Sequence, residues 1–189
     1  EYYGELAVGE LADYRVRNRQ DRENVYFLGM FLRVKRALEF LCDQPEWDGA
    51  NLHTRGGSQG GAQTIAGAYL EPRVSAFCAL VPAMCDHTGS RVDRPTGWPQ
   101  FANIDGEGNE QALETGRYFD MMNFAAGISV PGFWSVGLLD GTCNPVGVYA
   151  AYNAHPGSKQ MFDAPTYGHE IPMGVFPVMT EWQTAQIKG

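Results

Sequence analysis

The sequence predicts an α/β fold with a mostly parallel sheet and helices on both of its faces. Apolar stretches of strand length alternate with stretches of helical periodicity, an order typical of such folds. Two strand candidates, 74–81 and 130–138, are apolar almost throughout, as parallel strands covered on both faces are. With 189 residues, 44% of them hydrophobic, the chain has enough apolar material for a real core.

The expected elements follow from periodicity and from helix-breaking residues. The stretch 24–42 carries apolar residues at spacings of three and four, so it predicts an amphipathic helix that Pro45 ends. The other expected helices are 62–70, 110–124, 145–153 and 171–187, and the other expected strands are 51–55 and 159–162. Residues 86–109, rich in Pro and Gly, predict an irregular insertion, and insertions of that length are often functional.

Charge and cysteine usage narrow the classes of function. The chain has 14 Lys and Arg against 22 Asp and Glu, a net charge of −8, so we expect no binding to nucleic acid or to anionic membranes. The uncharged stretch 121–139 is interrupted by glycines and Pro131, and it predicts a helix end, a turn and a strand instead of a membrane span. Four irregularly spaced cysteines predict buried free thiols, with a disulfide as the alternative.

A glycine-rich stretch, Gly56-Gly57-Ser58-Gln59-Gly60-Gly61, lies between an expected strand and an expected helix. G-x-S-x-G in that position is the nucleophile-elbow pattern of α/β-hydrolases, in which the serine occupies a strained turn between closely packed neighbours. The pattern predicts Ser58 as a nucleophile above the carboxyl edge of the sheet, with the backbone N–H of Gln59 directed at a developing oxyanion. A P-loop and a dinucleotide fingerprint do not fit these residues, and a plain structural turn is the alternative.

The rest of a catalytic triad follows in the order that α/β-hydrolases use, which is Ser, acid, His. Asp140 comes after the expected strand 130–138, and His169 comes after the last expected strand in a Tyr-Gly-His-Glu turn. Both therefore belong at the carboxyl edge of the sheet. We expect Ser58 to attack an acyl carbon, His169 to take its proton and pass it to the leaving alcohol, and Asp140 to orient His169.

Other polar residues have simpler interpretations. Asp163 is a reserve candidate for the acid, although it lies at the end of a different strand. His53 is expected to be packed or capped within a strand, and His155 to be solvated in a turn. Cys85-Asp86-His87 lacks a second cluster that would complete a metal site. The stretch 105–110 misses the spacing of a calcium loop and predicts a solvated acidic loop.

Seven short motifs follow one another in a fixed order between residues 55 and 170, within a resemblance that covers about residues 20–185. They are RGGSQGG at 55–61, PRV at 72–74, YFD at 118–120, NFA at 123–125, GLLD at 137–140, AAYN at 150–153 and YGHE at 167–170. Together they resemble the acetyl xylan esterase and cephalosporin C deacetylase family of α/β-hydrolases. The Ser-Gln-Gly-Gly elbow is much more specific than G-x-S-x-G alone.

The resemblance implies a serine esterase that removes acetyl groups from short-chain and carbohydrate esters, particularly acetylated xylo-oligosaccharides. It implies Ser58, Asp140 and His169 as the triad and the Gln59 N–H as one oxyanion donor. It also implies that no metal and no organic cofactor is needed, and that the protein forms a homo-oligomer. The alternatives are a peptidase-type α/β-hydrolase and a catalytically silent binding module with the same fold.

The resemblance further implies that residues 1–189 are the C-terminal portion of one α/β-hydrolase domain with an insertion at about 86–109. The first strands of the sheet and the second oxyanion donor are then expected upstream of Glu1, and activity is expected to need that N-terminal part. Tyr2 and Tyr3 lie too close to the first helix to supply the donor. Cytoplasmic and secreted or periplasmic locations both stay open.

Overall fold

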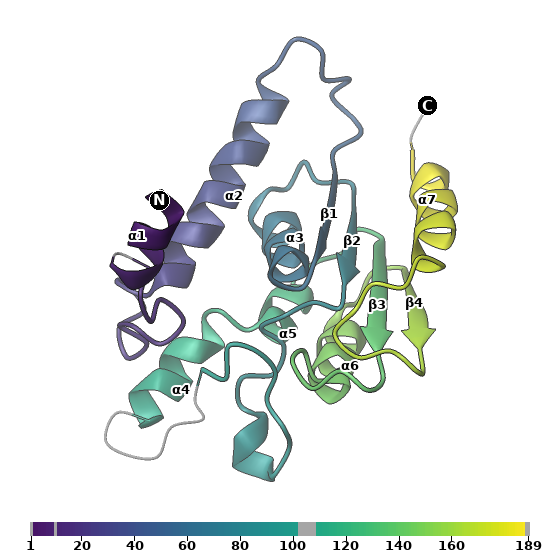
Figure 1. The fold of residues 1–189 in the computed structure, drawn as a ribbon. Coiled ribbons are helices and arrows are strands. Elements are labelled where there is room, and N and C mark those ends of the chain that lie inside the picture. The colour runs from purple at the N-terminus through teal and green to yellow at the C-terminus, as the bar shows by residue number, and fades with distance from the viewer. Residues whose placement is uncertain (1, 10, 102–108, 188–189) are drawn as a thin grey trace.

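The structure, a computed structural model, describes residues 2–9, 11–101 and 109–187. In this part of the chain, one sheet has the strand order β1-β2-β3-β4, and every neighbouring pair is parallel. The strands are β1 (His53–Gly57), β2 (Ala76–Leu80), β3 (Gly132–Gly137) and β4 (Lys159–Ala164). Because the strands run the same way, their carboxyl ends meet at one edge of the sheet (Figure 1).

Helices cover both faces of this sheet. The helices of the described residues are α1 (Tyr2–Val8), α2 (Tyr26–Cys42), α3 (Gln59–Leu70), the 3-10 helix η1 (Gly89–Val92), α4 (Asn109–Arg117), α5 (Met121–Ala125), α6 (Pro145–Ala154) and α7 (Val175–Ala185). Helix α3 packs on β1 and β2, with α2 and α5 against it, and α6 contacts β3. Helix α7 contacts β2 and β3.

Alternation along the central strands builds a separate core on each face. Phe77 of β2 and Trp134 of β3 belong to the larger core with α2, α3 and α5, and their rings meet edge to face at 5.5 Å. Their neighbours Cys78 and Phe133 point to the other face, where they pack with Met179 of α7. The predicted α/β architecture with helices on both faces is therefore confirmed.

The expected helix 110–124 is wrong as a single element, because the chain forms α4 and α5 instead. Asp120 lies between them as the N-cap of α5, and its carboxylate accepts the backbone N–H of Met122 at 2.9 Å. The same carboxylate accepts the N–H groups of Asp86 and His87. A break in the helix at Asp120 thus lets one buried carboxylate satisfy three backbone donors.

The expected closing helix 171–187 is too long at its N-terminal end. Helix α7 begins only at Val175, whose N–H donates to the carbonyl of Pro172 at 2.9 Å in a turn. The other expected elements are confirmed with boundaries shifted by a few residues. The stretch 121–139 forms α5, a turn and β3, as predicted. None of the helices in the described residues is long and apolar enough to cross a membrane.

The expectation that His155 is solvated is wrong, because its side chain is fully buried. Its ring packs against Phe77 and Trp134, and Nε2 lies 3.0 Å from the carbonyl of Val130. Burial lowers the pKa of His155. The turn folds back under the start of β3 so closely that a Cβ atom on Gly157 would lie 2.6 Å from the carbonyl of Ser129.

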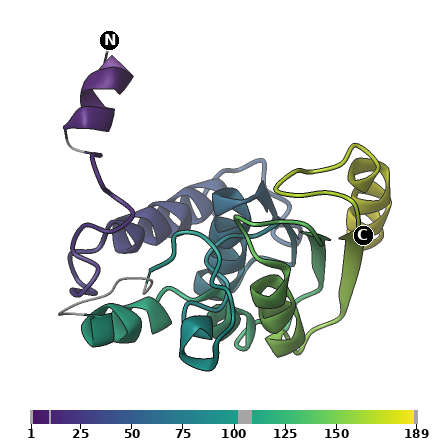
Figure 2. The same cartoon turned by 60° about the horizontal axis from the view of Figure 1, so that its bottom comes forward.

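Three further outcomes concern the ends of the described segments and the cysteines. Helix α1, which the sequence did not predict, has no buried residue and lies beyond α2, away from the sheet (Figures 1 and 2). All four cysteines are free thiols, buried except for the half-buried Cys42, as predicted. The expected acidic loop 105–110 lies outside the described residues apart from its last two positions, which begin α4.

Candidate active site

Ser58 occupies a strained turn between β1 and α3. Its φ of 55° and ψ of −121° are a combination that non-glycine residues rarely adopt, at a cost of about 1–3 kcal/mol. Two hydrogen bonds hold the turn against the end of β2: the Ser58 N–H donates to the carbonyl of Leu80 at 2.9 Å, and the Ala83 N–H donates to the carbonyl of Ser58 at 3.0 Å. The geometry is that of a nucleophile elbow.

Close approach of backbone requires two of the four elbow glycines, Gly56 and Gly61, whereas Gly57 faces the end of a side chain. A Cβ atom on Gly56 would overlap the backbone of Gly60, and one on Gly57 would lie 2.5 Å from Cδ1 of Ile171. A Cβ atom on Gly61 would lie 2.9 Å from Cα of Pro82. A Cβ atom on Gly60 would meet nothing within 4 Å, so the space around Gly60 does not explain its identity.

Asp140 lies at the carboxyl end of β3 and is buried, with 2% of its surface exposed. Its Oδ1 accepts two backbone hydrogen bonds, from Thr142 and from Cys143, both at 2.8 Å. The loop after β3, residues 140–144 and called the acid loop below, thus wraps around its own carboxylate. These bonds fix the direction of the second oxygen, Oδ2, which is left for a partner from another segment.

That partner is His169, which follows β4. Its Nδ1 lies 2.8 Å from Oδ2 of Asp140, and its Nε2 lies 2.8 Å from Oγ of Ser58. Since the carboxylate can only accept, Nδ1 carries the proton and Nε2 offers a lone pair to the Ser58 hydroxyl. The structure therefore brings together all three triad residues that the sequence predicts, with the His169 side chain 29% exposed.

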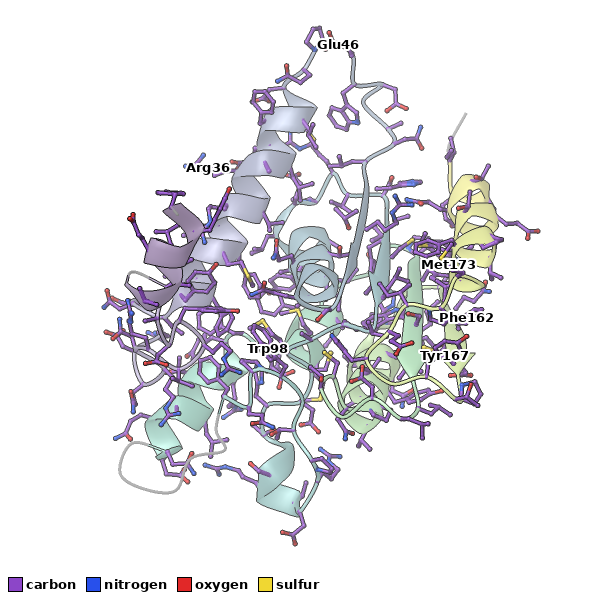
Figure 3. The ribbon with its side chains drawn as sticks, viewed as in Figure 1. Arg36, Glu46, Trp98, Phe162, Tyr167 and Met173 are labelled. Carbon is purple, nitrogen blue, oxygen red and sulfur yellow. The ribbon has the colours of Figure 1, made fainter. Side chains whose placement is uncertain are left out.

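The loop that carries His169 lies directly on the end of β3. The N–H of Leu139 donates to the carbonyl of Tyr167 at 3.0 Å, and a Cβ atom on Gly137 would overlap the carbonyl oxygen of Gly168. Figure 3 places Tyr167 and Met173, which flank His169 in the sequence, on this same loop between β4 and α7. A glycine at position 137 is what allows His169 to reach the acid.

The other sequence candidates lie elsewhere. Asp163, the reserve acid, accepts a hydrogen bond from the hydroxyl of Tyr149, which raises the pKa of Tyr149 to about 12. His53 is half-buried in β1, and burial lowers its pKa. In the stretch Cys85-Asp86-His87, the Asp86 carboxylate pairs with Arg94 at 2.6 Å, so it does not join its neighbours around a common centre.

Two features of the site were not predicted from the sequence. The first is a strap, residues 84–98, which belongs largely to the irregular insertion. The N–H of Met84 donates to the carbonyl of Trp98 at 2.9 Å, and the N–H of Trp98 donates to the carbonyl of Thr142 at 2.6 Å. The strap therefore runs from the residue after Ala83, which binds the elbow, to the acid loop. In Figure 3, Trp98 lies toward the carboxyl edge of the sheet, and its ring packs on Phe27 of α2 at 5.8 Å.

The second feature is Cys143, a buried thiol of the acid loop. Burial raises the pKa of Cys143 to about 12, the charge of Asp140 acts in the same direction, and a hydrogen bond with the Ser58 side chain opposes them. The thiol thus lies beside the nucleophile and stays protonated at neutral pH. No pattern in the sequence signals it, because the contact joins residues far apart in the chain.

Gln59 is the first residue of the twelve-residue helix α3. Its backbone N–H has no acceptor within the helix, because the first turn of a helix has no preceding carbonyls. The positive end of the helix dipole lies at the same place. The N–H next to Ser58 is thus suited to binding a negatively charged oxygen.

Comparisons with known proteins identify the family of the chain. The family model of acetyl xylan esterase (AXE1) matches residues 6–185. The acetyl esterase Axe7A of Xylanibacter ruminicola is 31% identical over 175 residues, which are 93% of this chain and 40% of that protein.

Two solved structures are also similar. The acetyl xylan esterase from Paenibacillus sp. R4 has a TM-score of 0.83 at 29% identity, covering 92% of this chain and 57% of that one. Acetyl xylan esterase 1 from Thermoanaerobacterium has a TM-score of 0.81 at 29% identity, covering 93% and 58%. The chain therefore spans between two fifths and three fifths of the length of these relatives.

More distant structures share the fold alone. An acylaminoacyl peptidase from Pyrococcus horikoshii has a TM-score of 0.64 at 14% identity. The elbow at Ser58, the order of the triad residues and the family match over residues 6–185 all lead to one assignment. The chain belongs to the acetyl xylan esterase (AXE1) family and has the α/β-hydrolase fold.

Proposed function

We propose that the protein is a serine carboxylesterase that removes acetyl groups from carbohydrate esters through a Ser58–His169–Asp140 triad. One observation carries the proposal: a continuous line of hydrogen bonds, each 2.8 Å long, joins Oγ of Ser58 to His169 and His169 to Asp140. Such a line, ending on a serine at a strained elbow, is the arrangement that acyl transfer needs.

In the first half of the reaction, Oγ of Ser58 attacks the carbonyl carbon of the acetyl group and its proton passes to Nε2 of His169. The buried carboxylate of Asp140 stabilises the imidazolium that forms. The negative charge on the former carbonyl oxygen is stabilised by the N–H of Gln59 at the start of α3. His169 then gives its proton to the leaving sugar oxygen, and the C–O bond of the ester breaks.

In the second half, the acetyl group is bound to Ser58 as an ester, and water replaces the sugar. His169 takes a proton from the water, whose oxygen attacks the acetyl carbon, and then returns the proton to Oγ of Ser58. Acetate leaves, and the free hydroxyl group of Ser58 is regenerated. The proton transfers between Oγ of Ser58 and Nε2 of His169 follow a hydrogen bond that the resting site already contains.

The acetyl and carbohydrate parts of the proposal rest on the relatives. Relatives at 31% and 29% identity are named acetyl esterase and acetyl xylan esterase, and they support an acetylated oligosaccharide as substrate. The peptidase alternative has only fold-level support, at 14% identity. A silent binding module is disfavoured because the serine, the histidine and the acid are in contact.

A homo-oligomer remains a prediction from the family resemblance. Tyr2 and Tyr3 do not provide a second oxyanion donor, because α1 lies beyond α2 and away from the sheet (Figures 1 and 2).

The test is hydrolysis of p-nitrophenyl acetate by the intact protein. Ser58→Ala should lower kcat by about 10⁴-fold or more, because the nucleophile is lost while the fold is kept. Ser158→Ala, which changes an exposed serine outside the site, is the control and should match the wild type. A Ser58→Ala rate equal to that of the wild type would show that the triad assignment is wrong. Acetate release from acetylated xylo-oligosaccharides then tests the substrate.

A further inference from the structure

Three metal-ligating side chains converge at the triad. Ligand atoms of Asp140, Cys143 and His169 all lie within 4.8 Å of one another. Among the described residues, this is the group of three such side chains that could hold a metal ion. The acid loop produces the convergence, because the Cys143 N–H donates to Oδ1 of Asp140 and so brings the thiol back beside the carboxylate. His169 arrives from the loop after β4. Catalysis explains Asp140 and His169, but it has no use for a thiol at this point.

The donor set selects a class of cation. A thiolate sulfur, an imidazole nitrogen and one carboxylate oxygen are the ligands that Zn²⁺ and Cd²⁺ prefer. Mg²⁺ and Ca²⁺ need six or more oxygen ligands, as a rule. Here Oδ1 of Asp140 already accepts two N–H groups, so the cluster offers few oxygens to a hard cation.

We propose that Asp140, Cys143 and His169 form an inhibitory site for a thiophilic divalent cation of the Zn²⁺ and Cd²⁺ type. On binding, the Cys143 thiol releases its proton to solvent and the sulfur forms a bond to the cation. His169 contributes the lone pair of one ring nitrogen. The cation is an inhibitor in this proposal and takes no part in ester hydrolysis.

Inhibition follows whichever nitrogen of His169 binds the cation. If Nε2 binds it, the lone pair that must accept the Ser58 proton is occupied. If Nδ1 binds it, the ring proton moves to Nε2, which then has no lone pair left to accept the Ser58 proton. The metal-bound state and the active state therefore exclude each other.

The surroundings also set the strength of binding. The cation must displace the proton of the Cys143 thiol, which is buried. We therefore expect weaker binding than at a closed structural zinc site with four protein ligands. The partly exposed His169 side chain gives the cation a route from solvent.

The test is a titration of the intact protein with CdCl₂, with two readouts. One is the rate of p-nitrophenyl acetate hydrolysis, and the other is the ultraviolet charge-transfer absorption of a cadmium–thiolate bond. Cys143→Ala should raise the half-inhibitory concentration at least tenfold relative to wild type, with each variant compared with its own metal-free rate, and should abolish the absorption band. Cys42→Ala changes the half-buried cysteine at the end of α2 and should behave as wild type, as should MgCl₂ in place of CdCl₂.

Cys143→Ala inhibited at the wild-type concentration, or retaining the band, would overturn the proposal. So would a wild-type protein without the band. The inhibition readout rests on the proposed esterase function, whereas the absorption band does not. If no variant hydrolyses the ester, the loss of the band in Cys143→Ala alone decides the question. Should that variant fail to fold, Cys143→Ser keeps the side-chain shape while replacing the soft sulfur by oxygen, and it should also lose the band.

Discussion

The backbone N–H of Trp98 donates to the carbonyl of Thr142 over 2.6 Å and ties the strap to the acid loop. The acid loop in turn holds the carboxylate of Asp140, because the N–H groups of Thr142 and Cys143 donate to its Oδ1. At its other end the strap follows Ala83, which binds the carbonyl of Ser58. The nucleophile and the acid are therefore positioned by one continuous piece of backbone as well as by the sheet.

A methyl group at the strap should disturb the acid without touching substrate. A Cβ atom on Gly97 would lie 3.2 Å from the backbone nitrogen of Asn144 and 3.4 Å from the carbonyl of Thr142. Gly97→Ala should push the acid loop by a fraction of an ångström and lower kcat by about three- to tenfold, with KM unchanged, because misplaced catalytic groups slow the chemical step. Steady-state kinetics with p-nitrophenyl acetate measures both parameters.

Gly141→Ala is the matched control for this variant. It adds the same methyl group to the acid loop itself, but at a position where a Cβ atom meets nothing within 4 Å. Its kinetics should equal those of the wild type. Equal rates for Gly97→Ala and the wild type would show that the strap does not position Asp140.

The close approach of the His169 loop to β3 predicts that a methyl group at Gly137 lowers kcat more than one at Gly97. A Cβ atom on Gly137 would overlap the carbonyl oxygen of Gly168, and two backbones cannot yield as a flexible side chain does. Gly137→Ala should move His169 away from Asp140, lower kcat by about 100-fold and lower Tm. Gly168→Ala, whose Cβ atom would lie at an ordinary 3.6 Å from the carbonyl of Leu139, should keep most of the activity. Kinetics and thermal unfolding of both variants check the pair.

The two candidate acids can be separated by removing one charge at a time. Asp140→Asn keeps an oxygen for the Thr142 and Cys143 N–H groups but replaces the acceptor of the His169 proton by a donor. The wrong tautomer of His169 then predominates, and kcat should fall by about 10⁴-fold with little change in Tm. Asp163→Asn removes only the partner of Tyr149 and should change kcat less than twofold. A large loss in Asp163→Asn instead would reverse the assignment.

The elbow and the order of the triad could be predicted because their requirements are local. Close packing of a strand against a helix needs small residues at fixed offsets from Ser58. The glycines at positions 56 and 61 meet this requirement and can be recognised in the sequence. Parallel strands place their carboxyl ends together, so residues just after two strands, Asp140 and His169, meet without any further signal.

The unpredicted parts depend on contacts between distant segments. Asp120 breaks the expected helix because it binds N–H groups 33 and 34 residues away. His155 is buried because its turn folds back under β3. The sequence of a turn with Pro and Gly does not distinguish a buried turn from an exposed one. Cys143 reaches Ser58 only through the shape of the acid loop. None of these contacts leaves a periodicity, so no pattern in one sequence reveals them.

An ion pair between the buried Glu71 and the exposed Arg73, at the amino end of the sheet, predicts how stability depends on pH. Glu71, 2% exposed, accepts hydrogen bonds from the guanidinium of Arg73, which lowers the pKa of Glu71 to about 2. Because the folded pKa lies below the ordinary value of 4.5, this pair stabilises the fold fully above pH 4.5. That contribution is lost as the pH falls from 4.5 toward 2, where the folded protein takes up the proton.

Glu71→Gln should remove this part of the pH dependence. The variant should be less stable than wild type at pH 7, because the amide cannot pair with the Arg73 charge, and the difference between the two proteins should shrink at pH 3. Urea unfolding midpoints of both proteins at the two pH values measure it. Glu39→Gln, which alters an ion-paired carboxylate on the surface of α2, serves as control and should change the midpoint much less. A gap between wild type and Glu71→Gln that stays constant from pH 7 to pH 3 would contradict the lowered pKa of Glu71.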